Sequence, residues 1–304
     1  MQFIHYGFIF CMIRASVSGL SASSATPSRQ RVVVSGAGGQ TGQLLFRKML
    51  ALPEEFDPVG LVRSEESKAA LIMAGGIPES AVAVVDVTDT AAVKKFTEDR
   101  GSCSTFCICT SAKPKPNGVM DEATGRPLFG FPNGIPENVD WLGQKNQIDA
   151  CSKDAHVLIC SSMGGTDPDH PLNMLGRTTN SDGTISGGNI LKWKRKAEMY
   201  LIDSGKKYTI VHPGGLIDEA GGERELVLGV DDSMEGTDSR TVPREDVAEI
   251  MLQALRHPDL YSNKSFDLRA KPVDGENVSP TTDFRTLVES LNGKNTDYSL
   301  GEVL

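Results

Sequence analysis

The sequence predicts an α/β protein built on a doubly wound, mostly parallel sheet. Two observations lead to this prediction: from Arg31 onward short β-branched runs alternate with helical stretches, and these runs are apolar almost throughout. Alternation is typical of parallel strands joined by crossover helices, and continuously apolar strands suit a sheet covered on both faces. With 304 residues, 39% of them hydrophobic, the chain can bury one large core of this kind.

The expected strands are the β-branched and apolar runs, whose side chains pack well on a pleated surface. In chain order they are residues 32–35, 58–62, 81–85, 105–110, 156–160, 208–211 and 264–268.

The expected helices fill the intervals between these strands, and glycines that favour helix ends follow several of them. They are residues 41–51, 64–73, 90–99, 138–153, 190–204, 244–255 and 282–291. Two Gly/Pro-rich intervals, 113–136 and 164–188, exceed the usual connection length and are interpreted as functional loops or lids.

The charge and the cysteines exclude several function classes. Forty Asp and Glu against 31 Lys and Arg give a net charge of −9, which repels phosphate backbones and anionic lipid surfaces. We therefore expect no nucleic-acid partner. The six cysteines show no CxxC pair and no Cys/His metal spacing, so we expect buried thiols, no disulfide framework and no metal site.

Residues 1–30 differ from the rest of the chain. The first acid is Glu54, and the apolar stretch 3–13 is followed by an arginine and a Ser/Thr/Ala-rich run. This composition is typical of a transit peptide and predicts a plastid or another organelle, with residues 31–304 as a single folded domain. A signal plus transit peptide, an unstructured extension, a misplaced start codon and a cytoplasmic protein stay open. The stretch is too short to span a bilayer.

A glycine-rich turn follows the first expected strand and opens the first expected helix. Gly36, Gly39 and Gly42 form a GxxGxxG pattern in that strand-turn-helix context. The first glycine permits a tight turn, the second lets backbone approach a pyrophosphate, and the third permits close packing of helix on strand. The pattern predicts dinucleotide binding; a tight turn without a ligand is the alternative.

The residue after the second expected strand indicates which dinucleotide binds. An acid there selects NAD, but the chain has Arg63 followed by Ser64. A guanidinium can pair with a ribose 2′-phosphate, so NADP(H) is favoured over NAD(H); a solvated arginine is the alternative. Asp86, after the third strand, is placed to accept from the adenine amino group, or else caps a helix, a role that Asp89 fits as readily.

Four further segments, 109–112 (CTSA), 161–165 (SSMGG), 193–198 (WKRKAE) and 213–216 (PGGL), resemble the atypical short-chain dehydrogenase/reductases, in particular plant NAD(P)-binding proteins of the NmrA-like/epimerase-like group. The resemblance covers about residues 30 to 290. It implies a seven-stranded, mostly parallel Rossmann sheet with a small C-terminal substrate lobe. It also implies cofactor contacts at Gly36, Gly39, Gln40, Thr41, Gly42, Arg63, Asp86, Thr110, Ser111, Ala112, Lys196, Pro213, Gly214, Gly215 and Leu216.

The same family implies a catalytic Ser, Tyr and Lys, of which only two have a counterpart here. Ser162 suits the serine position and Lys196 the lysine position, but Lys192 stands where the tyrosine is expected. We therefore expect an NADP(H)-dependent oxidoreductase in which Ser162 polarises a small organic substrate and Lys196 grips the nicotinamide ribose. The missing phenol leaves open a non-catalytic NADP(H)-binding redox sensor or regulatory protein. The sequence names neither the substrate nor the oligomeric state.

Overall fold

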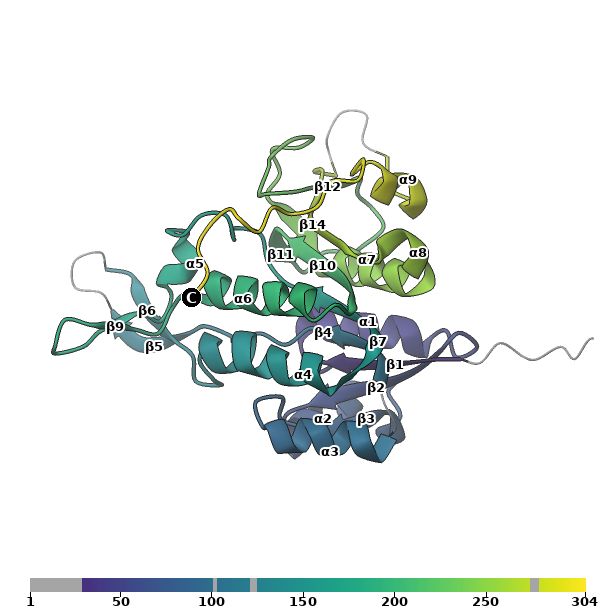
Figure 1. Cartoon of the computed structure of the whole chain (residues 1–304), viewed down its shortest axis with the longest axis horizontal. Coiled ribbons are helices and arrows are strands. Elements are labelled where there is room, and N and C mark those ends of the chain that lie inside the picture. The colour runs from purple at the N-terminus through teal and green to yellow at the C-terminus, as the bar shows by residue number, and fades with distance from the viewer. Residues whose placement is uncertain (1–28, 101–102, 121–124, 274–278) are drawn as a thin grey trace, which may run out of the picture.

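The computed structural model describes residues 29–100, 103–120, 125–273 and 279–304 (Figure 1). The predicted targeting segment 1–30 lies outside the described residues except for its last two positions. Gln30 already belongs to the first strand, where its backbone amide donates to Glu55 O and its side chain donates to Thr105 Oγ1. The first strand therefore begins slightly earlier than the sequence predicts.

Within the described residues, eight strands form one sheet in the order β12-β14-β10-β7-β4-β1-β2-β3, and only β12 runs antiparallel to its neighbour. The predicted doubly wound, mostly parallel sheet is confirmed. The chain crosses over between β3 and β4, which makes the gap between β1 and β4 the switch point where such folds bind ligands. The strands are β1 Gln30–Ser35, β2 Phe56–Val62, β3 Val82–Val84, β4 Cys103–Ile108, β7 Cys151–Cys160, β10 Lys207–Pro213, β12 Leu226–Gly229 and β14 Lys264–Ala270.

Helices cover both faces of the sheet. On one face α1 packs against α7, and Phe46 and Met251 enter a shared core; on the other, α3, α4 and α6 bury Phe96, Ile148 and Leu201. Figure 1 shows α4 and α6 side by side across the sheet. The helices are α1 Gln40–Leu50, α2 Glu65–Met73, η1 Glu79–Ala81, α3 Thr90–Arg100, η2 Glu137–Gly143, α4 Gln144–Ala150, α5 Pro171–Met174, α6 Ile190–Asp203, α7 Arg244–Arg256, α8 Pro258–Tyr261 and α9 Phe284–Glu289.

Three sequence expectations need correction. The helix expected at 138–153 is a π-helical segment, η2, followed by α4, and β7 begins at Cys151 because that residue already pairs with Cys103 across an irregular stretch of β4. The last helix is shorter than expected, since Asp283 caps it by accepting from Thr286 N at 3.0 Å. The sheet has an edge strand, β12, that the resemblance does not imply.

The two long loops contain small hairpins. β5 Lys115–Met120 pairs with β6 Pro127–Gly130, and β8 Thr178–Thr179 pairs with β9 Ile185–Ser186. A third small pair, β11 Gly215–Ile217 with β13 Thr241–Pro243, follows β10. Figure 1 shows β5, β6 and β9 together at one end of the molecule, away from α7 and α8.

Candidate functional site

The glycine turn brings bare backbone to the N-terminus of α1. Gly36 has φ +69°, and a Cβ there would lie 2.6 Å from the carbonyl oxygen of Cys109 at the end of β4. A Cβ on Gly42 would lie 2.3 Å from Gly36 O, and Gly39 N donates to that same oxygen at 2.7 Å. Side chains at these positions would push the turn away from β1 and β4. The turn thus leaves the amides of the helix N-terminus accessible to an anion.

A cleft of about 630 Å³ opens beside this turn, at the carboxyl ends of β2, β3 and β4, and its size suits a large ligand. Six of the residues predicted to bind the cofactor line it: Gly36, Gly39, Arg63, Asp86, Thr110 and Ser111. Residues that sequence reasoning did not single out also line it, among them Gln43, Ser67, Thr88, Lys113, Asn133 and Asn138. The cleft and its bare-backbone turn fit a dinucleotide.

Arg63 and Asp86 stand at the cleft, but Ser64 does not line it. Arg63 Nη1 donates to Asn133 O at 3.1 Å, which ties the tip of β2 to the segment after β6. Ser64 caps α2, because its hydroxyl oxygen accepts a hydrogen bond from Ser67 N at 3.3 Å. Asp86 Oδ1 accepts from Thr88 N at 2.9 Å in a local turn, and Asp89 caps α3. The helix-cap alternative for Asp86 is therefore wrong.

Several other predicted cofactor residues surround the cleft without lining it. Gln40 Nε2 donates to Asp218 Oδ2 at 3.3 Å, and Ala112 N donates to Asp140 Oδ2 at 3.0 Å. Gly215 N donates to the carbonyl oxygen of Arg240 at 2.6 Å. Thr41 and Gly42 lie within α1, Pro213 ends β10, Gly214 follows it, and Leu216 lies in β11. Their contacts with a cofactor stay predictions.

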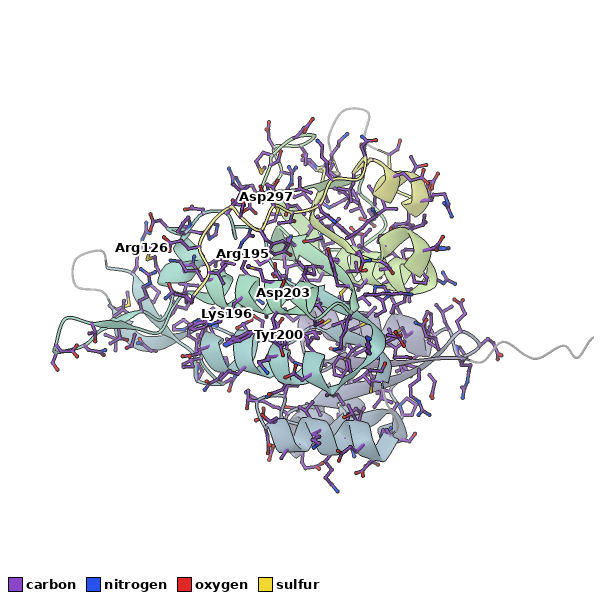
Figure 2. All side chains as sticks on the ribbon, in the orientation of Figure 1. Arg126, Arg195, Lys196, Tyr200, Asp203 and Asp297 are labelled. Carbon is purple, nitrogen blue, oxygen red and sulfur yellow. The ribbon has the colours of Figure 1, made fainter. Side chains whose placement is uncertain are left out.

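The lysine that points inward from α6 is Lys194. Its ammonium lies 2.8 Å from Asp140 Oδ1, and 6% of its side chain is exposed. Lys196 lies on another side of the helix, with its ammonium 5.1 Å from the ring centroids of both Trp141 and Trp193. Figure 2 labels Lys196 on the stretch of α6 that also carries Tyr200, whose ring contacts Trp141. Neither Lys194 nor Lys196 lines the cleft, and the contact of Lys196 with a cofactor stays a prediction.

Helix phase explains this difference. The buried residues of α6 recur at helical spacing, as at Ile190, Leu191, Lys194, Ala197 and Leu201, so position 194 lies on the inward stripe. Residues two apart on a helix point in different directions. Counting this apolar stripe along the sequence is the signal that could have found Lys194.

No tyrosine is among the described residues that line the cleft or the small cavity beside Ser162. Lys192, at the expected tyrosine position, pairs with Glu302 at 2.5 Å. The Tyr200 hydroxyl donates to Asp149 Oδ1 at 2.5 Å, and that carboxylate raises the pKa of the phenol. A phenolic proton donor must therefore be replaced by another group if the site reduces a carbonyl.

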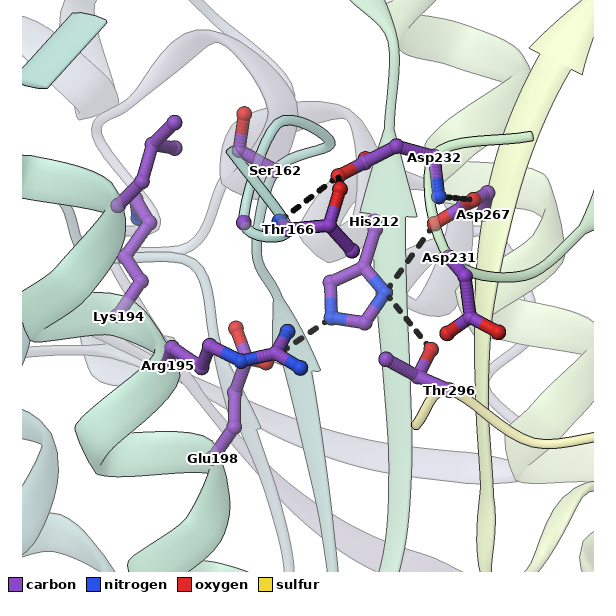
Figure 3. A pocket seen from close by; sticks show the side chains of 12 residues that line it. Ser162, Thr166, Lys194, Arg195, Glu198, His212, Asp231, Asp232, Asp267 and Thr296 are labelled. Carbon is purple, nitrogen blue, oxygen red and sulfur yellow. Dashed lines mark hydrogen bonds and ion pairs between the residues drawn. The ribbon is translucent and has the colours of Figure 1, made fainter. Parts of the chain in front are cut away.

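Ser162 lies beyond β7 in a cavity of about 10 Å³, room for about one water. Ser162 Oγ donates to Met163 O at 3.0 Å. Lys194 lines the same cavity, and so do the charged side chains around His212 (Figure 3). Ser162 and Lys194 thus share one small space, whereas Lys196 does not border it.

His212 forms a buried charged cluster with two carboxylates. Burial acts to lower the pKa of His212, but Glu198, 3.0 Å from Nε2, and Asp267, 3.5 Å from Nδ1, raise it to about 10. Burial acts to raise the pKa of Glu198, and His212, the Ser161 hydroxyl and Arg195 together lower it to about 2. At neutral pH the cluster therefore contains an imidazolium between two carboxylates.

In the part of the chain that the structure describes, no cluster of His, Cys, Asp and Glu has the arrangement of a metal site. No helix there has the length and apolar character needed to cross a membrane.

The strand order, the glycine turn and the cleft at the switch point define a dinucleotide-binding Rossmann protein. The NAD(P)H-binding family model matches residues 36–258, more than half of the sequence, so the chain belongs to the NAD(P)H-binding family. The NAD(P)-binding Rossmann fold that the resemblance implies is confirmed.

Known proteins agree with this assignment. An uncharacterised chloroplastic protein of Arabidopsis thaliana is 42% identical over 282 residues, which covers 91% of this chain and 80% of that protein. Sanguinarine reductase of Eschscholzia californica is 41% identical over 282 residues, with 86% and 95% covered. A Rossmann-fold NAD(P)-binding family protein from Shigella flexneri matches with a TM-score of 0.53 at 18% identity, covering 84% of this chain and 100% of that chain; this likeness shows the fold alone.

Proposed function

We propose that this protein is an NADP(H)-dependent reductase that transfers a hydride to a small organic substrate. The observation that carries the proposal is that Ser162 and the buried Lys194 line one cavity, at the edge of the sheet that also holds the cleft. A relative of similar length, sanguinarine reductase, is a reductase by name, which supports the same reaction class.

The glycine turn and the strand tips hold the dinucleotide in this proposal. Gly36 and Gly39 leave backbone amides free for the pyrophosphate, and Asp86 accepts from the adenine. Arg63 pairs with the 2′-phosphate through its guanidinium, which favours NADPH over NADH. Lys194 takes the ribose-binding role that the sequence suggests for Lys196.

When bound, NADPH supplies a hydride, which is a proton together with two electrons, from C4 of its nicotinamide. The Ser162 hydroxyl donates a hydrogen bond to the oxygen of a substrate carbonyl or enone, which makes the accepting carbon more electrophilic. The π electrons of the substrate double bond move to that oxygen as the new C–H bond forms. Lys194 Nζ then gives a proton to the oxygen and regains one from water, so charge and atoms balance.

The test measures NADPH oxidation across a panel of carbonyls and enones, and separately with sanguinarine, using Lys194→Met and Lys196→Met as a matched pair on one helix. We expect the larger loss of turnover from Lys194→Met, since Met keeps the side-chain length but loses the ammonium. A larger loss of turnover from Lys196→Met would show that Lys196, not Lys194, has the ribose-binding and proton-donating role. Ser162→Ala should also lower kcat.

The cavity beside Ser162 favours a second candidate. Room for about one water is too little for an organic substrate, as expected of a non-catalytic NADP(H)-binding redox sensor. Tight NADPH binding with no turnover of any panel member would select this candidate over the reductase.

We also propose that the protein resides in plastids, because two of its relatives are named chloroplastic and residues 1–30 have the composition of a transit peptide. Imaging fluorescent fusions of the full chain and of a chain lacking residues 1–28 tests this. Equal distribution of the two would contradict it.

A further inference from the structure

The loop that follows β7 carries Ser162 and is held by hydrogen bonds on both sides of that residue. On one side, the Ser161 hydroxyl donates to Glu198 Oε1 on α6. On the other, the carboxylate of Asp232 accepts from Thr166 N at 2.9 Å and from the hydroxyl of the same residue at 2.6 Å. Both carboxylates come from elements outside the loop, so the position of Ser162 depends on where those carboxylates lie.

Both sets of hydrogen bonds lead to one imidazole. Glu198 Oε2 lies 3.0 Å from His212 Nε2, and Asp267 Oδ1 lies 3.5 Å from His212 Nδ1. Asp267 Oδ2 in turn accepts from Asp232 N at 2.8 Å. Figure 3 shows His212 between these partners, with Thr166 bonded to Asp232 above it. The network thus reaches Ser162 from two directions through His212.

His212 is the cation that allows two buried carboxylates to lie in this network. Its side chain is 5% exposed and each of the two carboxylates is 3% exposed. Anions so deeply buried and so close together repel unless a cation lies between them. Among the described residues, two other cations line the cavity. Lys194 pairs with Asp140, and Arg195 acts on Glu198 while it donates to Asp297 O at 2.6 Å, whereas His212 contacts both carboxylates.

We propose that His212 is a positioning residue for Ser162, holding the loop so that the Ser162 hydroxyl meets the substrate during hydride transfer. This role rests on the reductase function proposed above. Ser161, Thr166, Glu198 and His212 do not line the large cleft. Loss of His212 is therefore expected to lower kcat and to leave the Kd for NADPH unchanged.

The experiment compares His212→Gln with His156→Gln. Both histidines are buried on neighbouring strands of the sheet, but His156 bonds to Thr209 Oγ1 at 2.8 Å and is not part of this network. We expect His212→Gln to lower kcat by about a hundredfold, the effect of a misplaced catalytic group. His156→Gln should change stability without this split between kcat and Kd.

A second readout needs no turnover. Hydrogen exchange of the peptide 161–166, followed by mass spectrometry, should be about tenfold faster in His212→Gln, since a hydrogen bond to a charged group contributes about 1.5 kcal/mol or more. Exchange there should match the unchanged protein in His156→Gln. Adding Glu198→Gln to His212→Gln removes one of the two carboxylates that have lost their cation, while Ser161 keeps its acceptor, so it should restore part of both kcat and protection.

Asp232→Asn provides the same test if His212→Gln does not fold, because it weakens the hold on Thr166 without burying a charge. Unchanged exchange and unchanged kcat in both variants would overturn the positioning role. Faster exchange in a protein that turns over no panel member would overturn the reductase function instead, and with it the catalytic purpose of the loop.

Discussion

The cofactor cleft and the Ser162 cavity lie at the same edge of the sheet but are built in different ways. The cleft is open and made mostly of backbone, from the glycine turn at Gly36 to the strand tips at Arg63 and Thr110. The Ser162 cavity is nearly closed and made of charged side chains, with His212 and Glu198 almost fully buried. Binding a shared cofactor needs a conserved backbone shape, whereas choosing a substrate depends on side chains held in place by one another.

A substitution in the glycine turn of the cofactor cleft should have the largest effect on NADPH binding and stability. In Gly42→Ala the added Cβ would meet Gly36 O at 2.3 Å, so the turn must move. We expect saturable NADPH binding, measured by calorimetry, to be lost and stability to fall by about 1–3 kcal/mol.

Gly229→Ala in β12 is the control outside the cleft, because its Cβ would lie 3.9 Å from Arg269 Nη2 and from Ser233 O, an ordinary contact. Normal NADPH binding by Gly42→Ala would show that the turn does not depend on bare backbone.

Reversing the charge at the tip of β2 should have an intermediate effect. Arg63→Glu is expected to weaken NADPH binding by about ten- to a hundredfold, the worth of a hydrogen bond between charged groups, and to favour NADH. Fluorescence titration of both cofactors measures this. Arg285→Glu, an equal change of charge on exposed α9, should leave both affinities as they were. Equal NADPH and NADH affinities in the unchanged protein would refute the preference.

The charged side chains around the Ser162 cavity should make the stability of the protein depend on pH. The pKa of His212 is about 10 in the folded protein, above the ordinary value of 6.5, so its stabilisation is complete below pH 6.5 and is lost as the pH rises toward 10. We expect the Tm to fall over this range, and to fall less steeply in His212→Gln.

Burial raises the pKa of thiols such as Cys160, and this also makes stability fall as the pH rises. The quantity to compare is therefore the difference in Tm between the unchanged protein and His212→Gln at each pH. Parallel Tm curves would mean that His212 is not charged in the fold.

The same contrast explains how much could be predicted from the sequence. The strands and the turn at Gly36 follow from local patterns, because apolar runs and glycine spacing determine backbone shape within a few residues. Arg63 and Thr110 could be placed because parallel strands end at one edge of the sheet. The inward orientation of Lys194 follows from the helix phase of α6, whereas the family motif taken without that phase favours Lys196.

The charged cluster around His212 could not be predicted at all. Its members come from α6, the end of β10, the loop after β12 and β14, which are far apart in the sequence. No local pattern relates such residues, and they come together because α6 packs against β10 and β10 pairs with β14.

Residues 296 and 298 complete this cluster, which affects the order in which the site can form. Thr296 lies against His212, and Tyr298 donates to Glu198 at 3.1 Å while its ring stacks on Arg195. During synthesis the N-terminal strands leave the ribosome before these two residues do and can pair first. A nascent chain can therefore form its cofactor turn while its Ser162 loop is still unsupported, and the loop gains its full support only after residues 296 and 298 have emerged.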